Sequence, residues 1–563
     1  MIKGSVRAVT CLFLLGGAFA APLSCGSSKS GLNDDAAGDS SGGSANAGKG
    51  GGTLDIAGTG ADAGSRPQAS DAGSTGSPEC PSYQSMCGGA CIPTSVDPKN
   101  CGACGKTCAA DEACSAGVCS SDCLPGLTVC DQACSDLEND SAHCGACDKA
   151  CPSGQGCAKG RCVDSVPLGP DPKSCAGGGA PISVGSGPLS CLGNLAQTTF
   201  RWSLCSCTDL NVSAALSTDA FDSTTGPYKP GELGGGLGVD RDVTNWSEAV
   251  AVGGTLWVSG TKQYSSSGPA SQVKADLHLG GSWKASTPFT VAGAAYVGGT
   301  LSSVTVKGKT EQVQTVAPAC DCSAAQLVPV TAIVQAHSGT NNDNAAVGLD
   351  EKALEKPGAA LRVDLPCGNF YFTSISASLA LTVHVHGRTA IYVAGDVEAS
   401  SSLAFTLEPD AELDLFVAGT LKVSDTFVFG SPNYPALSRA YIGGNAKIAL
   451  SADVRLAGEL YAANSEQVVW SAKNAIYGSV FAGNFRSSDV TTIHYDRAVL
   501  KAGGNCGGDG GEGGGGPAEC GSCQDCHNQA CKNGKCADCG SDNDCCSPLV
   551  CSGGSCVPQV VIK

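Results

Sequence analysis

Two pairs of carboxylates are the residues best placed to do hydrolytic chemistry. The members of each pair are two positions apart, so both lie on one face of an extended strand: Asp396 with Glu398, and Glu412 with Asp414. Two carboxyls about 5–9.5 Å apart can perform glycoside hydrolysis. The other interpretation is that they are the solvent-facing positions of amphipathic strands. Thr420 replaces an acid in the next copy of the local phrase, so we favour this second interpretation and expect no catalytic residue.

A histidine pair could bind a metal ion. His384 and His386 point to one face of a strand, as two metal ligands would. No third ligand is near them in the sequence, so we expect ordinary solvent-facing or stacked side chains and no metal. His494 is expected to cap the last coil of the fold described below.

Two further motifs raise the question of cofactors. Cys523, Cys526 and His527 form a C-x-x-C-H, the attachment motif of haem c, but the many surrounding cysteines favour disulfides. The runs 341–344 and 542–544 are rich in Asn and Asp and could bind calcium weakly. Neither run matches an EF-hand, and both are typical of turns. We therefore expect no cofactor.

Charge and composition exclude several classes of partner. The net charge of −18 argues against nucleic acid and anionic membrane surfaces, because no basic patch is present to neutralise phosphate. The segment 306–310 lacks the first glycine of a phosphate loop, so nucleotide binding is not expected. The 36 cysteines do not fit a cytosolic enzyme, whose thiols would be kept reduced.

The first residues explain this cysteine usage. Residues 1–24 have a basic start and a short apolar run, which is typical of an export signal. The run is too short to span a bilayer. Its end, Pro22-Leu-Ser-Cys25, resembles a bacterial lipobox, although Pro22 stands where leucine is usual. The resemblance implies lipidation of Cys25 and an outer-membrane or cell-surface location; the alternative is cleavage after Ala20. Losing Cys11 and lipidating Cys25 leaves an even number of cysteines, which favours lipidation.

Residues 25–79 consist largely of Gly, Ser, Ala and Asp. Such a segment cannot bury enough apolar surface to offset the entropy of ordering, so we expect a disordered linker behind the lipid anchor.

The next segment is a tandem cysteine-rich repeat, at 80–119 and 123–162. Eight cysteines recur 43 residues later with every spacing preserved: Cys80, Cys87, Cys91, Cys101, Cys104, Cys108, Cys114 and Cys119, then Cys123, Cys130, Cys134, Cys144, Cys147, Cys151, Cys157 and Cys162. Units of about 40 residues need covalent cross-links in place of a core. Cys-x-x-Cys pairs also suit zinc, but an export signal favours disulfides. The pair resembles the stigma-specific cysteine-rich repeat, which implies an extracellular module and no reaction.

Residues 163–505 carry an internal repeat of β-prone phrases. The phrase at 391–397 recurs at 415–421, with apolar residues alternating at period two around a glycine. Looser copies occur upstream and downstream. The sequence therefore predicts a mainly β fold, a β-solenoid similar to a β-helix, with the glycines at the corners of its coils.

A helical insert is expected at about 323–360, with helices at 328–337 and 349–355, separating two halves of the solenoid. Two C-x-C segments flank the first half, one formed by Cys205 and Cys207 and the other by Cys320 and Cys322. We expect disulfides to join the first segment to the second.

The solenoid ends on the phrase Ile493-His-Tyr-Asp496. This ending resembles exported β-helical domains of bacterial surface and pilus-associated proteins. Together with the cysteine repeats it is similar to a family of uncharacterised lipoproteins of social, gliding bacteria. The resemblance implies a fold and a location but no catalytic residues.

A glycine-rich linker at 507–517 leads to a terminal module at 520–563. Its closely spaced cysteines are similar to those of knottin-type and Dickkopf-like modules, which implies disulfides at Cys545, Cys546, Cys551 and Cys556.

These patterns predict a non-catalytic surface lipoprotein with an adhesive or structural role, whose solenoid face contacts polysaccharide or surface proteins. Two alternatives remain open. One is a β-helix carbohydrate-active enzyme, a polysaccharide lyase or glycosidase, and the other is a polymer-forming β-helix scaffold.

Overall fold

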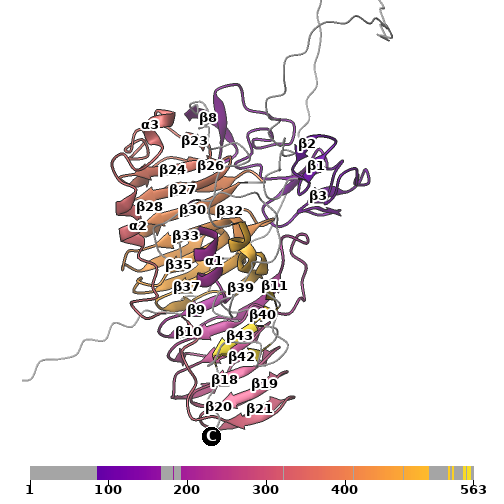
Figure 1. Cartoon of the computed structure of the whole chain (residues 1–563), viewed down its shortest axis with the longest axis vertical. Coiled ribbons are helices and arrows are strands. Elements are labelled where there is room, and N and C mark those ends of the chain that lie inside the picture. The colour runs from indigo at the N-terminus through magenta and orange to yellow at the C-terminus, as the bar shows by residue number, and fades with distance from the viewer. Residues whose placement is uncertain are drawn as a thin grey trace, which may run out of the picture. The chain divides into compact units, whose positions relative to one another are not determined.

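The computed structural model describes residues 85–166, 182 and 192–505, apart from 247, 321, 410 and 473 (Figure 1). It also describes the backbone of 530–532, 535–537, 549–552 and 555–558. Several expectations lie outside the described residues: the export signal, the linkers, the 542–544 run, Cys25, Cys80, Cys523, Cys526, His527, Cys545 and Cys546.

The two cysteine-rich repeats are built from short antiparallel hairpins: β1 (Ser85–Cys87) with β2 (Ala90–Ile92), β3 (Ala113–Ser115) with β4 (Val118–Ser120), β5 (Thr128–Cys130) with β6 (Ala133–Ser135), and β7 (Gln155–Ala158) with β8 (Arg161–Val166). Disulfides close them with the same connectivity, offset by 43 residues: Cys87–Cys104, Cys101–Cys114 and Cys108–Cys119, then Cys130–Cys147, Cys144–Cys157 and Cys151–Cys162, with Cys123–Cys134 in addition. Cysteine sulfur therefore fills the centre of each small unit, as the buried Cys101 and Cys114 show.

Residues 361–496, which we term the C-terminal coils, form a parallel β-solenoid with strands on three faces. The first face holds β23 (Leu361–Leu365), β26 (Leu381–Val385), β29 (Leu403–Leu407), β32 (Phe427–Gly430) and the start of β35 (Val454–Ala462). The second holds β24 (Gly368–Phe372), β27 (Arg388–Val393), β30 (Glu412–Val417), β33 (Ser438–Ile442), the end of β35, and β37 (Ile476–Ala482). The third holds β25 (Ile375–Ala377), β28 (Val397–Ala399), β31 (Leu421–Val423), β34 (Ile448–Ala452), β36 (Val468–Ala472) and β38 (Phe485–Ser487). The last strand of this part is β39 (Thr491–Asp496).

Residues 204–312, the N-terminal coils, repeat the same arrangement. Their strands are β9 (Leu204–Ser206), β10 (Leu210–Val212), β11 (Leu216–Phe221), β12 (Leu237–Val239), β13 (Val243–Thr244), β14 (Val250–Val252), β15 (Leu256–Val258), β16 (Gln263–Ser266), β17 (Ser271–Val273), β18 (Leu277–Leu279), β19 (Ser282–Val291), β20 (Ala295–Val297), β21 (Leu301–Val306) and β22 (Thr310–Gln312). The chain is therefore mainly β, as its period-two pattern predicts.

The order of the coils in space differs from their order in the sequence. The end of the C-terminal coils pairs in parallel with the start of the N-terminal coils on all three faces: β39 with β11, β37 with β9, and β38 with β10. Figure 1 shows the pink strands of the N-terminal coils continuing the stack of orange ones. The expected insert thus separates two halves in sequence only, because in space they form one continuous solenoid.

The other end of the C-terminal coils meets the second cysteine-rich repeat. Strand β8 pairs in parallel with β23, Leu361 lying opposite Asp164 and Val363 opposite Val166. The expected boundary between residues 162 and 163 therefore falls inside β8. This pairing covers the first edge of the stack, which would otherwise expose unpaired backbone groups.

A return segment, residues 313–329, runs from the last N-terminal coil back along the outside of the stack. Trp257 and Trp202 donate indole hydrogen bonds to its carbonyls at Ala317 (2.7 Å) and Ala319 (3.0 Å). Two disulfides, Cys205–Cys320 and Cys207–Cys322, join its two cysteines to the C-x-C of β9. The two C-x-C segments are thus bonded to each other at the junction of the two sets of coils.

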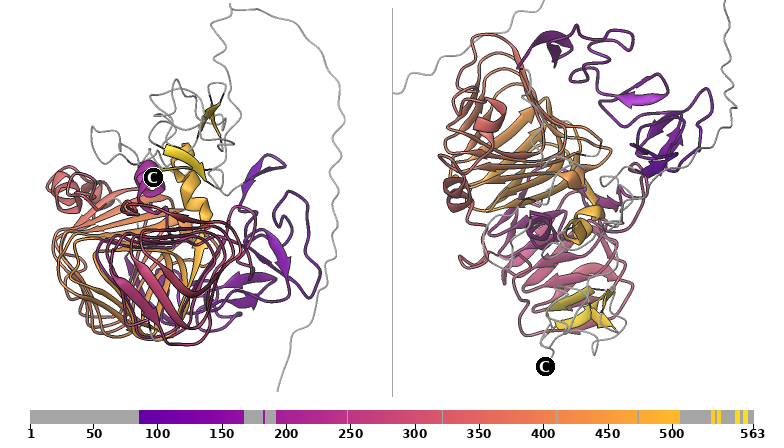
Figure 2. Two further views of the ribbon diagram at one scale, coloured as in Figure 1. Left: turned by 90° about the horizontal axis from the view of Figure 1, so that it is seen from below. Right: turned by 45° about the horizontal axis from the view of Figure 1, so that its top comes forward.

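Helices cover the outer surface of the stack (Figure 2). Within the insert, α2 (Val330–Ala336) packs over β30, and a short α3 (Asn344–Val347) follows. The prediction of a helix at 349–355 is wrong, because those residues form no helix. Instead, α3 ends at Val347 and is followed by Gly348 in the left-handed conformation. Outside the insert, α1 (Leu192–Thr199) packs against the 3₁₀ helix η3 (Arg497–Asn505), and a one-turn η2 (Pro435–Leu437) precedes β33.

Glycines stand at the coil corners because successive corners touch. A Cβ atom on Gly444 would lie 2.4 Å from the carbonyl oxygen of Gly419, and one on Gly419 would lie 2.5 Å from that of Gly395. Here glycine is required by this close approach of backbones.

We predict that Gly444→Ala lowers the free energy of unfolding by about 1–3 kcal/mol, because the added methyl group collides with backbone that cannot move freely. Denaturant unfolding of the oxidised protein measures the change. Gly358→Ala is the matched control, since nothing lies within 4 Å of its Cβ position. Equal stability of the two variants would contradict this account of the corners.

Candidate functional site

The carboxylate pair on β30 is buried in an ion-pair network. Arg439 donates two hydrogen bonds to Asp414, both of 2.7 Å, and one of 2.9 Å to Glu412. Arg388 donates to the other oxygen of Glu412 at 3.2 Å. Arg439 is fully buried, so the charges of both acids are matched by guanidinium groups inside the protein.

These cations also set the proton affinity of Glu412. Burial raises the pKa of its carboxyl, but Arg439 and Arg388 outweigh burial and hold the pKa below its usual value. Opposite Arg439 on the next strand, Glu459 is buried and accepts a hydrogen bond from Ser479, and burial raises its pKa well above the usual value. Sequence reasoning did not single out Glu459.

The second carboxylate pair lies on a different face of the solenoid. Glu398 is on β28, and Asp396 immediately precedes that strand. Both bind the ammonium group of Lys422 on β31, at 2.7 and 2.9 Å. Burial raises the pKa of Asp396, but its hydrogen bond from Lys422 and that from the Thr420 amide together lower it. The structure brings each pair together with cations, and it places the two pairs on separate sheets.

The histidine pair forms a cluster with two carboxylates. His384 Nε2 lies 3.1 Å from Glu408 Oε1, and His386 Nε2 lies 3.1 Å from Asp364 Oδ1. The second nitrogen of His384 contacts Thr406 Oγ1 at 2.8 Å. Sequence reasoning found the histidines and missed both acids, although their offsets of 24 and 22 residues correspond to one coil of the solenoid.

Burial and hydrogen bonding shift the pKa values in this cluster. Burial lowers the pKa of His384. The hydrogen bond from His384 lowers the pKa of Glu408. Burial raises the pKa of Asp364, but His386 and Arg362 outweigh burial, so its pKa is far below the usual value. Both shifts favour the ionised form of the two acids.

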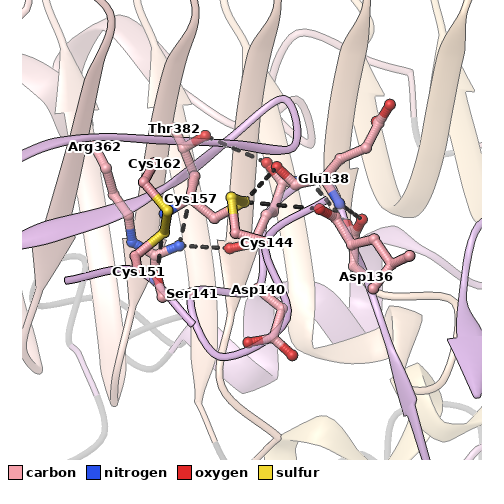
Figure 3. Close-up of a disulfide and its surroundings, with 12 residues drawn as sticks. Asp136, Glu138, Asp140, Ser141, Cys144, Cys151, Cys157, Cys162, Arg362 and Thr382 are labelled. Atoms are coloured by element: carbon pink, nitrogen blue, oxygen red, sulfur yellow. Dashed lines mark hydrogen bonds between the residues drawn. A yellow bond between two sulfur atoms is a disulfide. The ribbon is translucent and has the colours of Figure 1, made fainter. Parts of the chain in front are cut away.

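The cluster adjoins the contact between the solenoid and the second cysteine-rich repeat. Figure 3 shows Arg362 and Thr382 reaching toward the repeat. Arg362 donates to the carbonyl oxygen of Asn139 at 2.6 Å and also binds Asp364. Ser165 of β8 donates to the other oxygen of Asp364 at 2.8 Å.

The I-H-Y-D phrase holds the junction between the two sets of coils. His494 binds Asp219 at 2.7 Å, and Tyr495 donates its hydroxyl to the carbonyl oxygen of Phe200 at 2.7 Å. Asp496 accepts backbone N–H groups from Ser223, Ala436 and Ala498. The phrase thus has a structural role. His494 lies between two coils of one continuous stack, so it does not cap the last coil as expected.

The asparagine-rich run 341–344 is engaged with backbone. Asn344 pairs with both backbone groups of Tyr371, at 2.7 and 2.9 Å, and Asp343 accepts the amide of Asn369 at 2.7 Å. Asn342 donates to two nearby carbonyls. These contacts are those of a turn that positions α3 against β24.

A groove of about 500 Å³ lies on the face formed by β25, β28 and β31. Its lining combines hydroxyl groups, three lysines and one acid: Ser376, Ser378, Ser400, Ser424, Lys356, Lys422, Lys447 and Glu398. Other cavities lie between the cysteine-rich repeats and the coils, one of about 420 Å³ beside Glu412 and Arg439 and one of about 440 Å³ beside Arg455.

Two segments of the chain match known protein families. Residues 307–502 match a family described as a domain of unknown function (DUF7305), a span that covers the return segment and the C-terminal coils. Residues 68–122 match the stigma-specific STIG1-like protein family, which supports a cysteine-rich module of that type. No curated protein and no solved structure matches the chain. In the part of the chain that the structure describes, no helix is long and apolar enough to cross a membrane.

We predict that Asp414→Asn destabilises the protein by about 3–5 kcal/mol, because it leaves the buried Arg439 without its main partner. The midpoint of denaturant unfolding measures the loss. Glu398→Gln, which removes a carboxylate half-exposed on the surface, should have little effect. If Asp414→Asn left the midpoint unchanged, the ion-pair network would not have the structural role assigned to it.

Proposed function

We propose that this chain is an exported, non-catalytic protein of the cell surface, whose solenoid presents a binding face to polysaccharide or to another surface protein. One observation carries the proposal: each of the four candidate acids is ion-paired with an arginine or a lysine. Asp414 and Glu412 bind arginine, and Asp396 and Glu398 bind Lys422. An acid held in this way is poorly suited to donate or accept a proton during hydrolysis.

The disulfides support export. They occur in both cysteine-rich repeats and at the junction of the coils, and bridges of this number are formed in oxidising compartments. An oxidising, extracellular or secreted environment therefore fits this chain. We place it more specifically at the outer surface of a bacterial cell, held by a lipid on Cys25, on the strength of the lipobox-like ending of the export signal.

The groove over β25, β28 and β31 is the face that we assign to binding. Serine hydroxyls and lysine ammonium groups line it, and they can donate hydrogen bonds to sugar hydroxyl and carboxyl groups. The face is built on regular parallel strands, so its groups keep a fixed spacing along the stack, which suits a repeating polymer.

We predict that the purified protein binds surface polysaccharide without cleaving it. Lys422→Ala should weaken binding at least tenfold on a glycan array or by calorimetry, because it removes the central cation of the groove. Lys309→Ala, in the last N-terminal coil, is the matched control and should bind like the wild type.

Three outcomes would contradict this assignment. Release of sugar fragments that is abolished by Asp396→Asn or Asp414→Asn, in variants that remain folded, would show the β-helix enzyme instead. Filaments in electron micrographs would show a polymer-forming scaffold. Equal polysaccharide binding by the Lys422→Ala and Lys309→Ala variants would show that this groove is not the binding face.

The location has its own test. Cells fed a labelled fatty acid should incorporate the label into the wild-type chain and into no mature Cys25→Ala chain, because acylation requires that thiol. The Cys25→Ala protein should move from the membrane fraction to the soluble exported fraction. Equal labelling of both chains would overturn the lipid anchor and leave the exported fold unaffected.

A further inference from the structure

Four side chains with metal-ligating atoms converge on the outer face of the first three C-terminal coils. Asp364 is on β23, His384 and His386 are on β26 or directly after it, and Glu408 follows β29. One ligand atom each from Asp364, His384 and His386 lies within 4.8 Å of the other two. Glu408 Oε1 lies 3.1 Å from His384 Nε2 and 3.6 Å from His386 Nδ1, so it faces both imidazoles.

Carboxylates lie on both sides of the His386 ring. Asp364 also accepts from Arg362 and Ser165, so it is ionised and His386 donates its Nε2–H to it. The Nδ1 of His386 lies on the other side of the ring, 3.6 Å from Glu408 Oε1. A metal ion between Nδ1 and the carboxylate could be bound by both groups.

The surrounding contacts are those of ligating imidazoles. A histidine that binds a metal through one nitrogen usually donates its other N–H to an oxygen, which fixes the ring. Thr406 Oγ1 is placed to accept from His384 Nδ1, and Asp364 Oδ1 from His386 Nε2. With these tautomers, His384 Nε2 and His386 Nδ1 would bind the ion on the side where Glu408 lies, and the ion would replace the hydrogen bond between His384 and Glu408.

Distances and donor types select the class of ion. Ligands about 2.0–2.2 Å from a tetrahedral zinc ion lie roughly 3.3–3.5 Å apart, close to the 3.1 and 3.6 Å between Glu408 and the two imidazoles. Imidazole nitrogen suits zinc, copper and nickel, whereas calcium and magnesium prefer sets made only of oxygen. The side chains of His386 and Glu408 are 38% and 44% exposed, so an ion can enter from solvent.

We propose that the cluster of Asp364, His384, His386 and Glu408 forms a binding site for one divalent transition metal ion of the zinc type. The ion would join the second coil to the third, and through Asp364 to the first coil. Asp364 also contacts the second cysteine-rich repeat through Ser165, so metal binding would stiffen the end of the solenoid that carries the repeat. This metal site is independent of the polysaccharide face.

The experiment titrates the full oxidised chain, freed of metal by a chelator, with Zn²⁺ alone. Calorimetry should give one saturable site, and Ca²⁺ and Mg²⁺ should not compete for it. His386→Ala and Glu408→Gln should each weaken Zn²⁺ binding at least tenfold, and Asp364→Asn by about 10–100-fold through loss of ring orientation. Glu398→Gln removes an equally exposed carboxylate outside the cluster and should bind Zn²⁺ like the wild type.

Circular dichroism establishes that each variant is folded, and the Co²⁺ spectrum of the wild type gives a readout that needs no variant. Visible bands of a nitrogen- and oxygen-ligated ion are expected. A thiolate-to-metal band would assign the ion to cysteines and overturn the proposal. A lack of saturable Zn²⁺ binding would also overturn it, as would equal affinity in the wild type and a folded His386→Ala variant.

Discussion

The parallel pairing between the end of the C-terminal coils and the start of the N-terminal coils is the constraint on which the rest of the structure depends. Strand β39 pairs with β11 over six residues, from Leu216 opposite Thr491 to Phe221 opposite Asp496. Without this pairing each set of coils would expose an open edge and part of its apolar interior. With it, the interior is one hydrophobic core that includes Leu216, Leu204 and Val480 on the two sides of the junction.

This arrangement requires the chain to travel back along its own stack, and the return segment is built for that path. A column of aromatic side chains runs along the outside of the C-terminal coils: Tyr392, Phe416, Tyr441, Tyr461 and Phe481. Residues of α2, α1 and the return segment pack against this column, and His337, directly after α2, stacks on Tyr392 at 3.7 Å. The column continues in register through Cys205, Gly238 and Trp257, so the disulfide Cys205–Cys320 occupies a position that aromatic rings hold elsewhere. The disulfide and the aromatic rings thus both hold the return segment and the helix that follows it on the stack.

The stacking of the coils also decides which polar side chains meet on the outside of the solenoid. Each coil places a residue directly above its counterpart one coil earlier, so charges separated by 22 to 27 residues become neighbours. Opposite charges meet in this way at Asp414 and Arg439, and at Glu398 and Lys422. The histidine cluster differs, because two acids meet two imidazoles there, and this difference is the basis of the metal site that we propose.

The sequence by itself determined the local architecture. Period-two phrases around glycine predict the solenoid strands, and the offset of 43 residues between eight cysteines predicts two equivalent modules, because both signals depend on neighbours in the chain or on exact repetition. Only the tertiary structure decided which coil follows which, that Asp364 and Glu408 join the histidines, and that the candidate acids are bound by arginine and lysine. Those contacts are made across coils or across the junction, between residues from 22 to almost 300 positions apart. An alternating pattern specifies which face a side chain occupies, but it does not specify the coil that lies beside it.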